Sequence, residues 1–430
     1  MKASEQTEAW AAKYANGNIM ILPAVLRFRL YPSSKQEAKM VHTIEATRRL
    51  WNDALAHRKT RWESDSRPTS YNMQAAILTS EREHDAGLGS VHSQVAQDVL
   101  KRLDRAFQGF FKHRSRYPRF KKRSSTGSFA YPQAYNGSAK PDTLGRRLFL
   151  SKIGNVKTVF HRPLPKDALL KTCTVVREPD GKWFASLVFE DVVPLQNVVM
   201  RFVSPVGVDL GLRSLIVTSE GIEVSHPRFL RKAEKRLKRL QHAFSRKKKG
   251  SKNWFKARQR VASQHAKVRR QRSDLNHKLS FDFVKAHDFI AFEDLRVRSM
   301  VRNPKLAKSI HDAGWGQLVR FTEYKALSKG KRVVKVDPAY TTQECFHCGA
   351  LNKVALDVRE FDCVGCGRHL RRDHNASCIV LKRGLAKVGQ GMPELKPVEM
   401  GPLFVATTRE ASPVSEAGTT GPQGLEAHGF

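Results

Sequence analysis

The stretch Val206-Gly207-Val208-Asp209-Leu210-Gly211 marks the start of a folded unit near the middle of the chain. A short apolar run that ends in one acid and a glycine is typical of a buried strand with a carboxylate at its end. Leu215–Thr218 repeats the apolar pattern after a turn. We therefore expect an α/β domain whose first strand presents Asp209 at its end.

Two further acids end or begin predicted elements. Phe289–Phe292 is an apolar strand followed by Glu293, and Asp373 opens a helix predicted over about 374–387. Taken singly, such carboxylates are more often caps or ion-pair partners. An acid on the first strand, one on a later strand and one at a helix start is how a ribonuclease-H-like sheet builds a metal site. Because Mg²⁺ prefers oxygen ligands and two ions about 4 Å apart can hydrolyse phosphodiesters, we predict that Asp209, Glu293 and Asp373 are catalytic and bind two Mg²⁺ or Mn²⁺ ions.

Four of the six cysteines form two close pairs. They are Cys345, Cys348, Cys363 and Cys366, and 14 residues separate the pairs. Four thiolates give zinc a closed tetrahedral shell with no open position for catalysis. A glycine follows each pair, where it permits a tight turn that points amides at the sulfurs. A redox dithiol is the alternative, which two matched pairs argue against, so we predict structural Zn²⁺.

The chain carries a large excess of positive charge. Its 77 Lys and Arg oppose 40 Asp and Glu, a formal net charge of +37. Such an excess opposes compaction unless a polyanion neutralises it, and the phosphates of nucleic acid do so. An anionic membrane is the alternative partner, but a run of about 18 apolar residues, which a membrane span requires, is missing from the sequence. We therefore predict a nucleic-acid partner and no membrane span.

The positive charge is most concentrated between Arg228 and Arg272. Nineteen Lys and Arg face one acid there, Glu234, over two predicted helices that are broken at Gly250-Ser251. A charged helix face is usually only solvated, but unpaired like charges repel one another, so this ratio favours phosphate contact. The residues that we predict to contact nucleic acid are Lys235, Arg239, Lys247, Lys248, Arg269, Arg270 and Arg272 here, with Arg119, Lys121 and Lys122 in an earlier basic loop.

That basic loop, at 114–123, interleaves Tyr117 and Phe120 with cations. Aromatic rings among cations can stack on bases. The same rings could equally pin a solvated linker to the protein, and the sequence leaves both interpretations open.

The first half of the chain mixes strands and helices. Ala24–Tyr31 alternates apolar and basic residues, as in a strand with one face in water, and strands separated by turn signals recur over 148–192. These segments could together form a β-barrel that a helical insert splits. Within the insert, steps of three and four residues predict one apolar helix stripe in the core, formed by Val95, Val99, Leu103, Phe107, Phe110 and Phe111.

The two ends of the chain are expected to lack a fixed fold. Residues 1–23 look like a loose leader without the long apolar region of a secretory signal. Residues 389–430 are rich in Gly, Pro, Ser, Thr and Glu, the composition of a disordered tail.

Several motifs, taken in their order along the chain, form a specific set. The stretches are Phe28–Pro32, 110–121, Gly207–Gly211, Gln271–Lys278, Phe292–Leu295, Tyr340–Gly349, Phe361–Gly367 and Arg372–Ala376. This set, which spans most of residues 24–384, resembles that of the transposon-encoded TnpB nucleases, relatives of type V CRISPR effectors. The ordered set is far more specific than any single motif.

The resemblance implies a multidomain α/β fold. It consists of a ribonuclease-H-like RuvC domain with an inserted four-cysteine zinc ribbon, a split wedge β-barrel of the oligonucleotide-binding kind, and a helical recognition domain. The implied boundaries are 1–23 for the leader, 24–33 and 117–203 for the wedge, 34–116 for the recognition domain, 204–340 and 368–388 for RuvC, 341–367 for the zinc ribbon and 389–430 for the tail.

The resemblance also implies an activity. The family binds a noncoding RNA from its own transposon, recognises a short DNA motif beside the target and cuts the DNA, and Asp209, Glu293 and Asp373 occupy its catalytic positions. We thus expect an RNA-guided DNA endonuclease, monomeric in its complex with guide RNA and double-stranded target DNA, in the prokaryotic cytoplasm and at the nucleoid when bound to DNA. Arg371, where relatives often carry an acid, and Ser377, which replaces a common alanine, depart from the pattern without removing a ligand.

Three other functions fit the same residues. A miniature type V CRISPR effector would have nearly the same domains and chemistry, and the sequence does not separate the two. A guided DNA-binding repressor that does not cut is disfavoured by the three intact acids. A transposase that joins DNA strands without RNA is the third.

Overall fold

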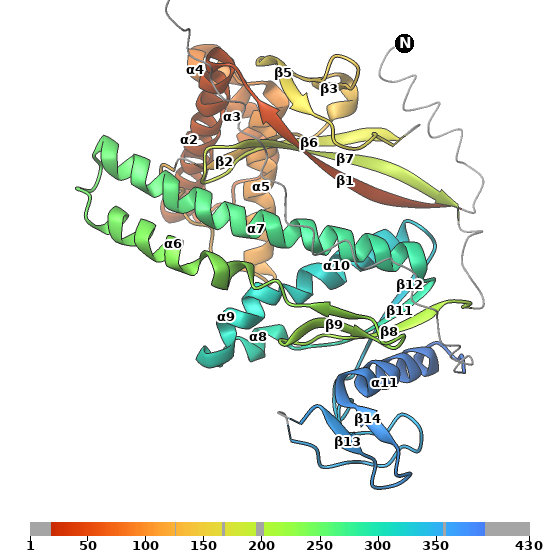
Figure 1. Ribbon diagram of the computed structural model, residues 1–430. Coiled ribbons are helices and arrows are strands. Elements are labelled where there is room, and N and C mark those ends of the chain that lie inside the picture. Colours follow the sequence, from red (N-terminus) through yellow and green to blue (C-terminus); the bar gives the residue numbers. More distant parts are fainter. Residues whose placement is uncertain (1–18, 125, 166–167, 195–201, 356–357, 392–430) are drawn as a thin grey trace, which may run out of the picture. The chain divides into compact units, whose positions relative to one another are not determined.

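The computed structural model describes residues 19–124, 126–165, 168–194, 202–355 and 358–391, and it divides the chain into two compact units. The first unit comprises Met1–Ser204, Arg228–Phe289 and Arg296–Val333, and the second comprises Pro205–Pro227, Ile290–Leu295 and Val334–Phe430. The helices and strands are labelled in Figure 1. The predicted leader and tail fall mostly outside the described residues.

The first unit is built around a seven-stranded sheet with the order β2-β6-β7-β1-β5-β4-β3 (Figure 1). Strand β1 (Ile19–Tyr31) lies between β7 (Trp183–Pro194) and β5 (Gly154–Val159) and pairs antiparallel with both. Strand β1 is thus paired with strands that come much later in the sequence, after the helices that follow β1. The remaining strands are β2 (Gly127–Tyr131), β3 (Ala139–Asp142), β4 (Arg147–Leu150) and β6 (Leu169–Arg177), and a short 3-10 helix spans Ala134–Asn136.

The alternation predicted for the first strand is confirmed. Leu26, Phe28 and Leu30 are buried in the core of the sheet, while Arg27 between them is exposed. The strand begins at Ile19, earlier than the predicted start at 24. One face of β1 therefore contributes to the core and the other remains in water, as the period of two requires.

Four helices lie between β1 and β2 in the described part of the chain. They are α2 (Ser34–Asp65), α3 (Tyr71–His84), α4 (Ala86–Gly89) and α5 (Ser93–Phe111). Helix α2 begins with a capping box, in which Ser33 accepts from the Gln36 amide and the Gln36 side chain accepts from the Ser33 amide. A second core forms where Leu55 of α2 meets Leu100 and Leu103 of α5.

The apolar stripe predicted along α5 is confirmed for most of its length. Val95, Val99, Leu103 and Phe107 are buried, Phe110 is half-buried, and Phe111 is 68% exposed. The prediction of a core position was wrong for Phe111. The spacing of apolar residues shows which face of a helix they share, but it does not show where the helix ends. Phe111 is the last residue of α5, where its side chain is exposed.

The basic segment forms a hairpin of two helices, α6 (Phe229–Ser245) and α7 (Lys252–Ala286), as predicted (Figure 1). Gly250 lies in the turn with a φ of +84°, a conformation that glycine adopts without strain. Helix α7 also packs against α10 (Trp315–Leu327), where His277 stacks on Phe321 with ring centroids 4.0 Å apart. Helices α8 (Val297–Met300) and α9 (Pro304–Ala313) lie between β11 and α10 in the chain.

The second unit contains a five-stranded sheet with the order β10-β9-β8-β11-β12. Its strands are β8 (Pro205–Asp209), β9 (Ser214–Thr218), β10 (Glu223–Ser225), β11 (Phe289–Glu293) and β12 (Arg332–Val336). Every residue of β8, β9 and β11 is buried, which accounts for their continuous apolar sequences. The strands predicted from the apolar runs are confirmed.

Helix α11 (Arg372–Lys387) packs closely on β8. A Cβ atom on Gly207 would lie 2.1 Å from the carbonyl oxygen of Ser377 and 2.6 Å from the amide nitrogen of Leu381, so only glycine permits this approach. Strands β13 (Glu360–Asp362) and β14 (His369–Arg371) form a small separate sheet that leads into α11. Among the described residues, none of the helices combines the length and apolar character needed to cross a membrane.

Candidate active site and zinc site

The three predicted catalytic acids all lie in the second unit. Asp209 is the last residue of β8, and Glu293 is the last residue of β11, the neighbouring strand in the sheet. Asp373 is the second residue of α11, the helix that packs on β8. Asp209 and Glu293 are each 7% exposed. Two adjacent strand ends and one helix start thus bring two buried carboxylates and the half-buried Asp373 into one region.

The surroundings of Asp209 and Glu293 disfavour their charged forms. Burial raises the pKa of Asp209 well above its usual range, and the negative charges of Glu293 and Asp373 raise it further. Burial also raises the pKa of Glu293, although a hydrogen bond from Thr341 and the charge of Arg383 oppose this. Neighbouring carboxylates that resist ionisation gain most from a bound cation, so this donor set fits hard divalent ions.

Two arginines contact Asp373, and neither was predicted as part of the site. Nη1 of Arg359 lies 3.0 Å from Oδ2, and Nε and Nη2 of Arg372 lie 3.2 and 3.1 Å from Oδ1. Arg372 belongs to one of the family motifs, but nothing in the sequence marked Arg359, which precedes β13. The carboxylate of Asp373 is thus oriented by the guanidinium groups of Arg359 and Arg372.

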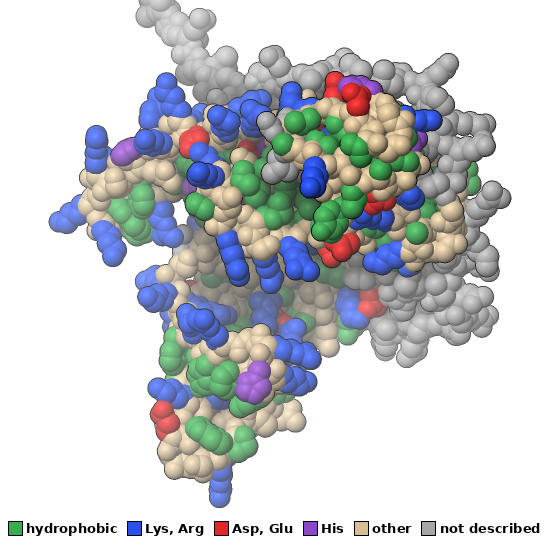
Figure 2. Space-filling model, turned by 90° about the horizontal axis from the view of Figure 1, so that it is seen from below, with side chains coloured by type: hydrophobic (Ala, Val, Ile, Leu, Met, Phe, Trp, Pro, Cys, Tyr) green, Lys and Arg blue, Asp and Glu red, His purple; other side chains and the backbone are tan. Residues whose placement is uncertain are grey.

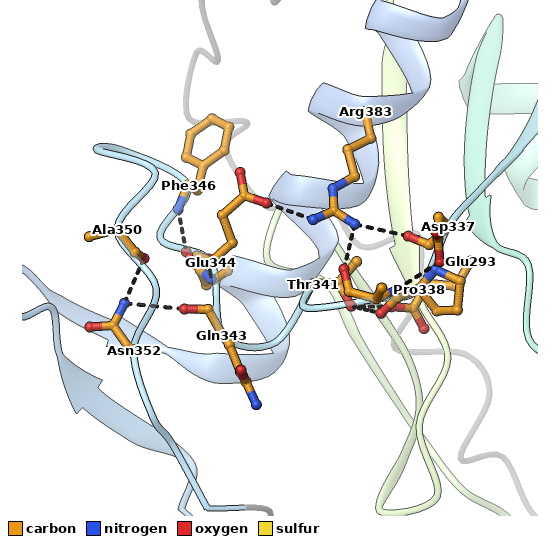
Figure 3. A network of polar contacts seen from close by, with 12 residues as sticks. Glu293, Asp337, Pro338, Thr341, Gln343, Glu344, Phe346, Ala350, Asn352 and Arg383 are labelled. Atoms are coloured by element: carbon orange, nitrogen blue, oxygen red, sulfur yellow. Dashed lines mark hydrogen bonds and ion pairs between the residues drawn. The ribbon is translucent and has the colours of Figure 1, made fainter.

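Figure 3 shows the polar contacts around Glu293. Thr341 donates a hydrogen bond of 2.6 Å to Oε1 of Glu293, and Arg383 of α11 donates to main-chain oxygens on either side of Pro338. Thr341 lies in the motif at 340–349, but the sequence assigned it no role.

The four predicted zinc ligands converge. Among the described residues, one group of three or more His, Cys, Asp or Glu side chains has all of its ligand atoms within 4.8 Å of one another. This group consists of Cys345, Cys348, Cys363 and Cys366. The Sγ atoms of Cys345 and Cys366 are 3.9 Å apart, and those of Cys348 and Cys363 are 3.5 Å apart. Sulfurs at the corners of a tetrahedron around zinc are roughly 3.8 Å apart for Zn–S bonds of about 2.3 Å, so the cluster fits zinc. The three carboxylates are spaced more widely.

The amides around Cys363 favour its thiolate over its thiol, whereas at Cys348, against the effect of the Ala350 backbone, hydrogen bonds with the neighbouring thiols, together with burial, raise the pKa to about 12. The amide of Gly365 lies 3.4 Å from Sγ of Cys363, and Nδ2 of Asn352 lies 3.8 Å from the same sulfur. Although burial opposes it, hydrogen bonds from the amides of Cys366 and Gly365 and from neighbouring thiols lower the pKa of Cys363 to about 6. Gly349 and Gly367 both have positive φ, which confirms the tight turns predicted after each pair.

The predicted nucleic-acid contacts divide into two groups. Arg119, Lys121, Lys122, Lys235, Arg239, Lys247 and Lys248 are exposed. Arg269, which is exposed as well, and Arg270 contact the buried carboxylate of Glu178 at 2.5 Å. Arg270 also contacts Asp180, and Arg272 contacts Asp312 at 3.2 Å. The second group therefore holds helix α7 against other parts of the first unit.

The basic loop at 114–123 is pinned by its aromatic residue Tyr117. This ring packs edge-on against Phe107 and Phe110 of α5, with centroids 5.5 and 5.3 Å away. Nζ of Lys121 lies 3.7 Å from the ring centre of Trp51 in α2. Phe120 is 54% exposed. Tyr117 therefore fits the interpretation in which the rings attach the loop to the protein. Phe120 is exposed and could still stack on a base.

Lys and Arg side chains dominate the face drawn in Figure 2, with few acidic side chains among them. Exposed cations thus lie outside the helical hairpin as well as on it, since Arg119, Lys121 and Lys122 are exposed too. Such a surface attracts the backbone of nucleic acids at long range.

Three family models match parts of the chain. One described as a probable transposase (OrfB of IS605) matches residues 198–304, and one described as the TNB domain of Cas12f1-like proteins matches 315–380. A third, described as a helix-turn-helix domain, matches 20–67, which the structure shows to be strand β1 followed by the single helix α2.

Two curated relatives match almost the whole chain. The "Putative RNA-guided DNA endonuclease" of Streptomyces pristinaespiralis is 36% identical over 364 residues, which are 84% of this chain and 89% of that protein. The "Putative RNA-guided DNA endonuclease InsQ" of Escherichia coli K12 is 32% identical over 383 residues, 85% of this chain and 93% of that one. This chain belongs to the TnpB family. The family resemblance of its motifs is therefore confirmed.

The TnpB-family chain also has the fold of a solved effector. It matches the protein in the "Cryo-EM structure of the Cas12f1-sgRNA-target DNA complex" with a TM-score of 0.51 and 11% identity, over 84% of this chain and 98% of that one. At this identity the likeness shows the shared fold alone. The mixed α/β architecture with a Cas12f-like TNB domain is thereby established for this TnpB-family chain.

Proposed function

We propose that this chain is an RNA-guided DNA endonuclease that cuts DNA with a site formed by Asp209, Glu293 and Asp373. The observation that carries the proposal is the placement of these acids: they end adjacent strands or begin the adjoining helix, and the charges of Glu293 and Asp373 raise the pKa of Asp209. Membership of a family whose relatives carry that name, over most of both chains, supports the same activity.

The finer fold assignment supports this function. The order β10-β9-β8-β11-β12 follows the ribonuclease-H pattern, with the first strand in the centre, so we assign residues 204–340 and 368–388 to a RuvC domain around a zinc ribbon at 341–367. The seven-stranded sheet corresponds to the wedge at 24–33 and 117–203, and the helices between them to the recognition domain at 34–116. These two domains would read the DNA motif beside the target.

Each acid has a defined part in the proposed reaction. When bound, two Mg²⁺ or Mn²⁺ ions about 4 Å apart supply the chemistry that activates water and neutralises the leaving oxygen. Asp209, Glu293 and Asp373 would together hold these ions, and Asp209 is the acid whose pKa the charges of the other two raise. Arg359 and Arg372 hold the Asp373 carboxylate and add positive charge beside the phosphate that is cut.

The exposed cations of α6 and the turn after it would bind the guide RNA or its duplex with DNA. Lys235, Arg239, Lys247 and Lys248 lie in the part of the hairpin, residues 228–272, where Glu234 is the one acid among 19 Lys and Arg. Recognition of this kind depends on backbone charge and A-form shape more than on base sequence. We propose one protein chain per guide RNA and one structural Zn²⁺ per chain, held by the four cysteines.

A second candidate is a miniature type V CRISPR effector. The match of residues 315–380 to the TNB domain of Cas12f1-like proteins favours it, because that domain is named after such an effector. The two functions share their chemistry and differ in the source of the RNA. A guide that joins the end of a transposon to flanking sequence indicates the first candidate, and a guide made from a repeat array indicates the second.

The experiment is to purify the chain from cells that also carry its native flanking DNA and to sequence the RNA that copurifies. The complex is then rebuilt with an RNA whose guide segment is replaced, and Mg²⁺ and a library of DNA duplexes are added. We expect one discrete RNA, and cuts that move to the sequences matching the new guide. Heterogeneous RNA, or cuts that do not follow the guide, would overturn the proposal. Guided binding without any product under Mg²⁺ or Mn²⁺ would instead identify a repressor.

A further inference from the structure

The side chain of Glu293 is held from one side by Thr341. The two residues are 7% and 2% exposed, and Oγ1 of Thr341 lies 2.6 Å from Oε1 of Glu293 (Figure 3). The same hydroxyl is 3.1 Å from the carbonyl oxygen of Pro338. A hydroxyl donates one proton, and a carboxylate is the stronger acceptor, so the shorter contact is the donated hydrogen bond. This bond holds the carboxylate of Glu293 in one orientation and leaves lone pairs free to bind a cation, both of those on Oε2 among them.

Thr341 itself is held by helix α11. Nη1 of Arg383 donates to the carbonyl oxygens of Asp337 and Ala339, at 3.0 and 2.7 Å, and Nη2 donates to Oε2 of Glu344 at 2.6 Å (Figure 3). These contacts fix the chain on both sides of Thr341. We call the segment Asp337–Glu344 the strap. Its position is thus tied to the same helix that carries Asp373.

The strap continues into the zinc ribbon. Asn375 of α11 donates to the carbonyl oxygen of Glu344 at 2.7 Å and accepts from the amide of Phe346 at 2.9 Å, so it holds the backbone on both sides of Cys345. Asn375 is 3% exposed. It lies two positions after Asp373, at the start of the helix.

A second amide side chain joins the strap to the other cysteine pair. Nδ2 of Asn352 donates to the carbonyl oxygen of Gln343 at 3.2 Å and lies 3.8 Å from Sγ of Cys363, and its Oδ1 accepts from the amide of Val364 at 2.9 Å. Hydrogen bonds between buried or half-buried groups therefore connect the cysteine cluster to the strap that contains Thr341.

We propose that Thr341 is a positioning residue for Glu293, and that the strap couples the folded zinc ribbon to the affinity of the three acids for divalent cations. This proposal rests on the proposed function, because it assumes that Glu293 binds a cation. Thr341 acts through Glu293 and touches neither metal nor DNA. Partners of this kind typically change metal affinity or activity by about 10- to 100-fold.

The test compares three variants of the zinc-loaded protein–RNA complex. Thr341→Val keeps the shape but removes the hydroxyl, Thr341→Ser keeps the hydroxyl, and Thr342→Val is the matched control at the next position. The readouts are the affinity for Mn²⁺ measured by calorimetry, and the Mg²⁺ concentration that gives half-maximal cleavage at saturating DNA. We expect Thr341→Val to weaken both by about tenfold or more, and Thr341→Ser and Thr342→Val to stay within about twofold of the wild type.

Two results would overturn the proposal. One is unchanged Mn²⁺ affinity in Thr341→Val, and the other is a folded Thr341→Ser that is as impaired as Thr341→Val. Should Thr341→Val not fold, Asn375→Ala provides the second test: it must lower Mn²⁺ affinity while one zinc per chain is retained. A wild-type complex that binds Mn²⁺ at this site but cuts no DNA would contradict the proposed function and leave the role of Thr341 to be judged on Mn²⁺ affinity.

Discussion

Nη1 of Arg359 lies 3.0 Å from Oδ2 and 3.3 Å from Oδ1 of Asp373, so an arginine from the loop before β13 holds the acid at the start of α11. Arg372 contacts the same carboxylate from the neighbouring position. Together they orient Asp373 and place positive charge beside the proposed position of the phosphate. Donors aimed at developing negative charge are among the strongest contributors to catalysis.

Arg359→Ala should therefore lower the single-turnover rate of cleavage by about tenfold or more, with DNA binding unchanged. Arg359→Lys should fall between, because lysine keeps the charge but loses the planar fork. The matched control is Arg371→Ala, since the contact of Arg371 with Glu223 lies at the surface, where the two side chains are 60% and 43% exposed. An Arg359→Ala variant that cuts as fast as Arg371→Ala would contradict the role given to Arg359.

The cysteine cluster predicts a tightly held zinc ion. Cys366→Ser should weaken zinc binding by at least about 100-fold, more than the loss of an outer partner would, since it removes one of four sulfur ligands. Competition with a chelator, followed by elemental analysis, measures this. Cys173→Ala is the control, because Cys173 is buried in the core of the seven-stranded sheet and should leave one zinc per chain. Equal zinc retention in the two variants would rule out the tetrahedral site.

The raised pKa of Asp209 predicts that this acid destabilises the fold when no cation is bound. Burial and the charges of Glu293 and Asp373 are the causes. For an acid with a raised folded pKa, the penalty is absent below its usual pKa near 4 and grows as the pH rises toward the folded value.

In Mg²⁺-free buffer at pH 8, Asp209→Asn should thus unfold a few degrees above the wild type, and the difference should shrink toward pH 5. Mg²⁺ at pH 8 should raise the Tm of the wild type and leave that of the variant nearly unchanged. Differential scanning calorimetry measures both. A variant that is less stable than the wild type at pH 8 would show that the carboxylates do not repel one another as described.

The helical hairpin predicts two kinds of basic residue. Lys247→Ala combined with Lys248→Ala should weaken RNA binding and reduce the slope of log affinity against log salt by about 0.9 for each phosphate that is no longer neutralised, with the Tm unchanged. Arg270→Ala should instead lower the Tm, because it leaves the buried carboxylate of Glu178 with one fewer cation. If Arg270→Ala reduced the slope of log affinity against log salt more than the double lysine variant did, this division would be contradicted.

The acids at strand ends could be located from sequence because an apolar run followed by one acid is a local pattern. Their grouping could not, since it depends on the strand order β10-β9-β8-β11-β12. Asp209, Glu293 and Asp373 were joined by comparing their positions with the acids of a ribonuclease-H-like sheet, and the order of motifs along the chain supported the same grouping. The four cysteines were simpler to group, because the spacing of the two pairs and the following glycines already describes a folded ribbon.

The supporting residues escaped the sequence for a related reason. Thr341 lies 48 residues from Glu293, and Arg359 lies 14 residues from Asp373, with no pattern connecting them. For the same reason, the charges between 228 and 272 did not show which of these cations have acidic partners elsewhere in the chain. Arg269, Arg270 and Arg272 looked unpaired within that window, but their partners Glu178, Asp180 and Asp312 come from outside it.

Cleavage by variants of the three acids tests whether they form one metal site. Asp209→Asn, Glu293→Gln and Asp373→Asn are each assembled with the copurified RNA, and the single-turnover rate on matched DNA is measured in Mg²⁺. Residues that act as one unit lose nearly all activity singly, so each variant should cut at least about 1,000-fold more slowly while binding the same DNA as tightly. Any one of them that binds normally and cuts within about tenfold of the wild type would show that its carboxylate is not part of the cutting site.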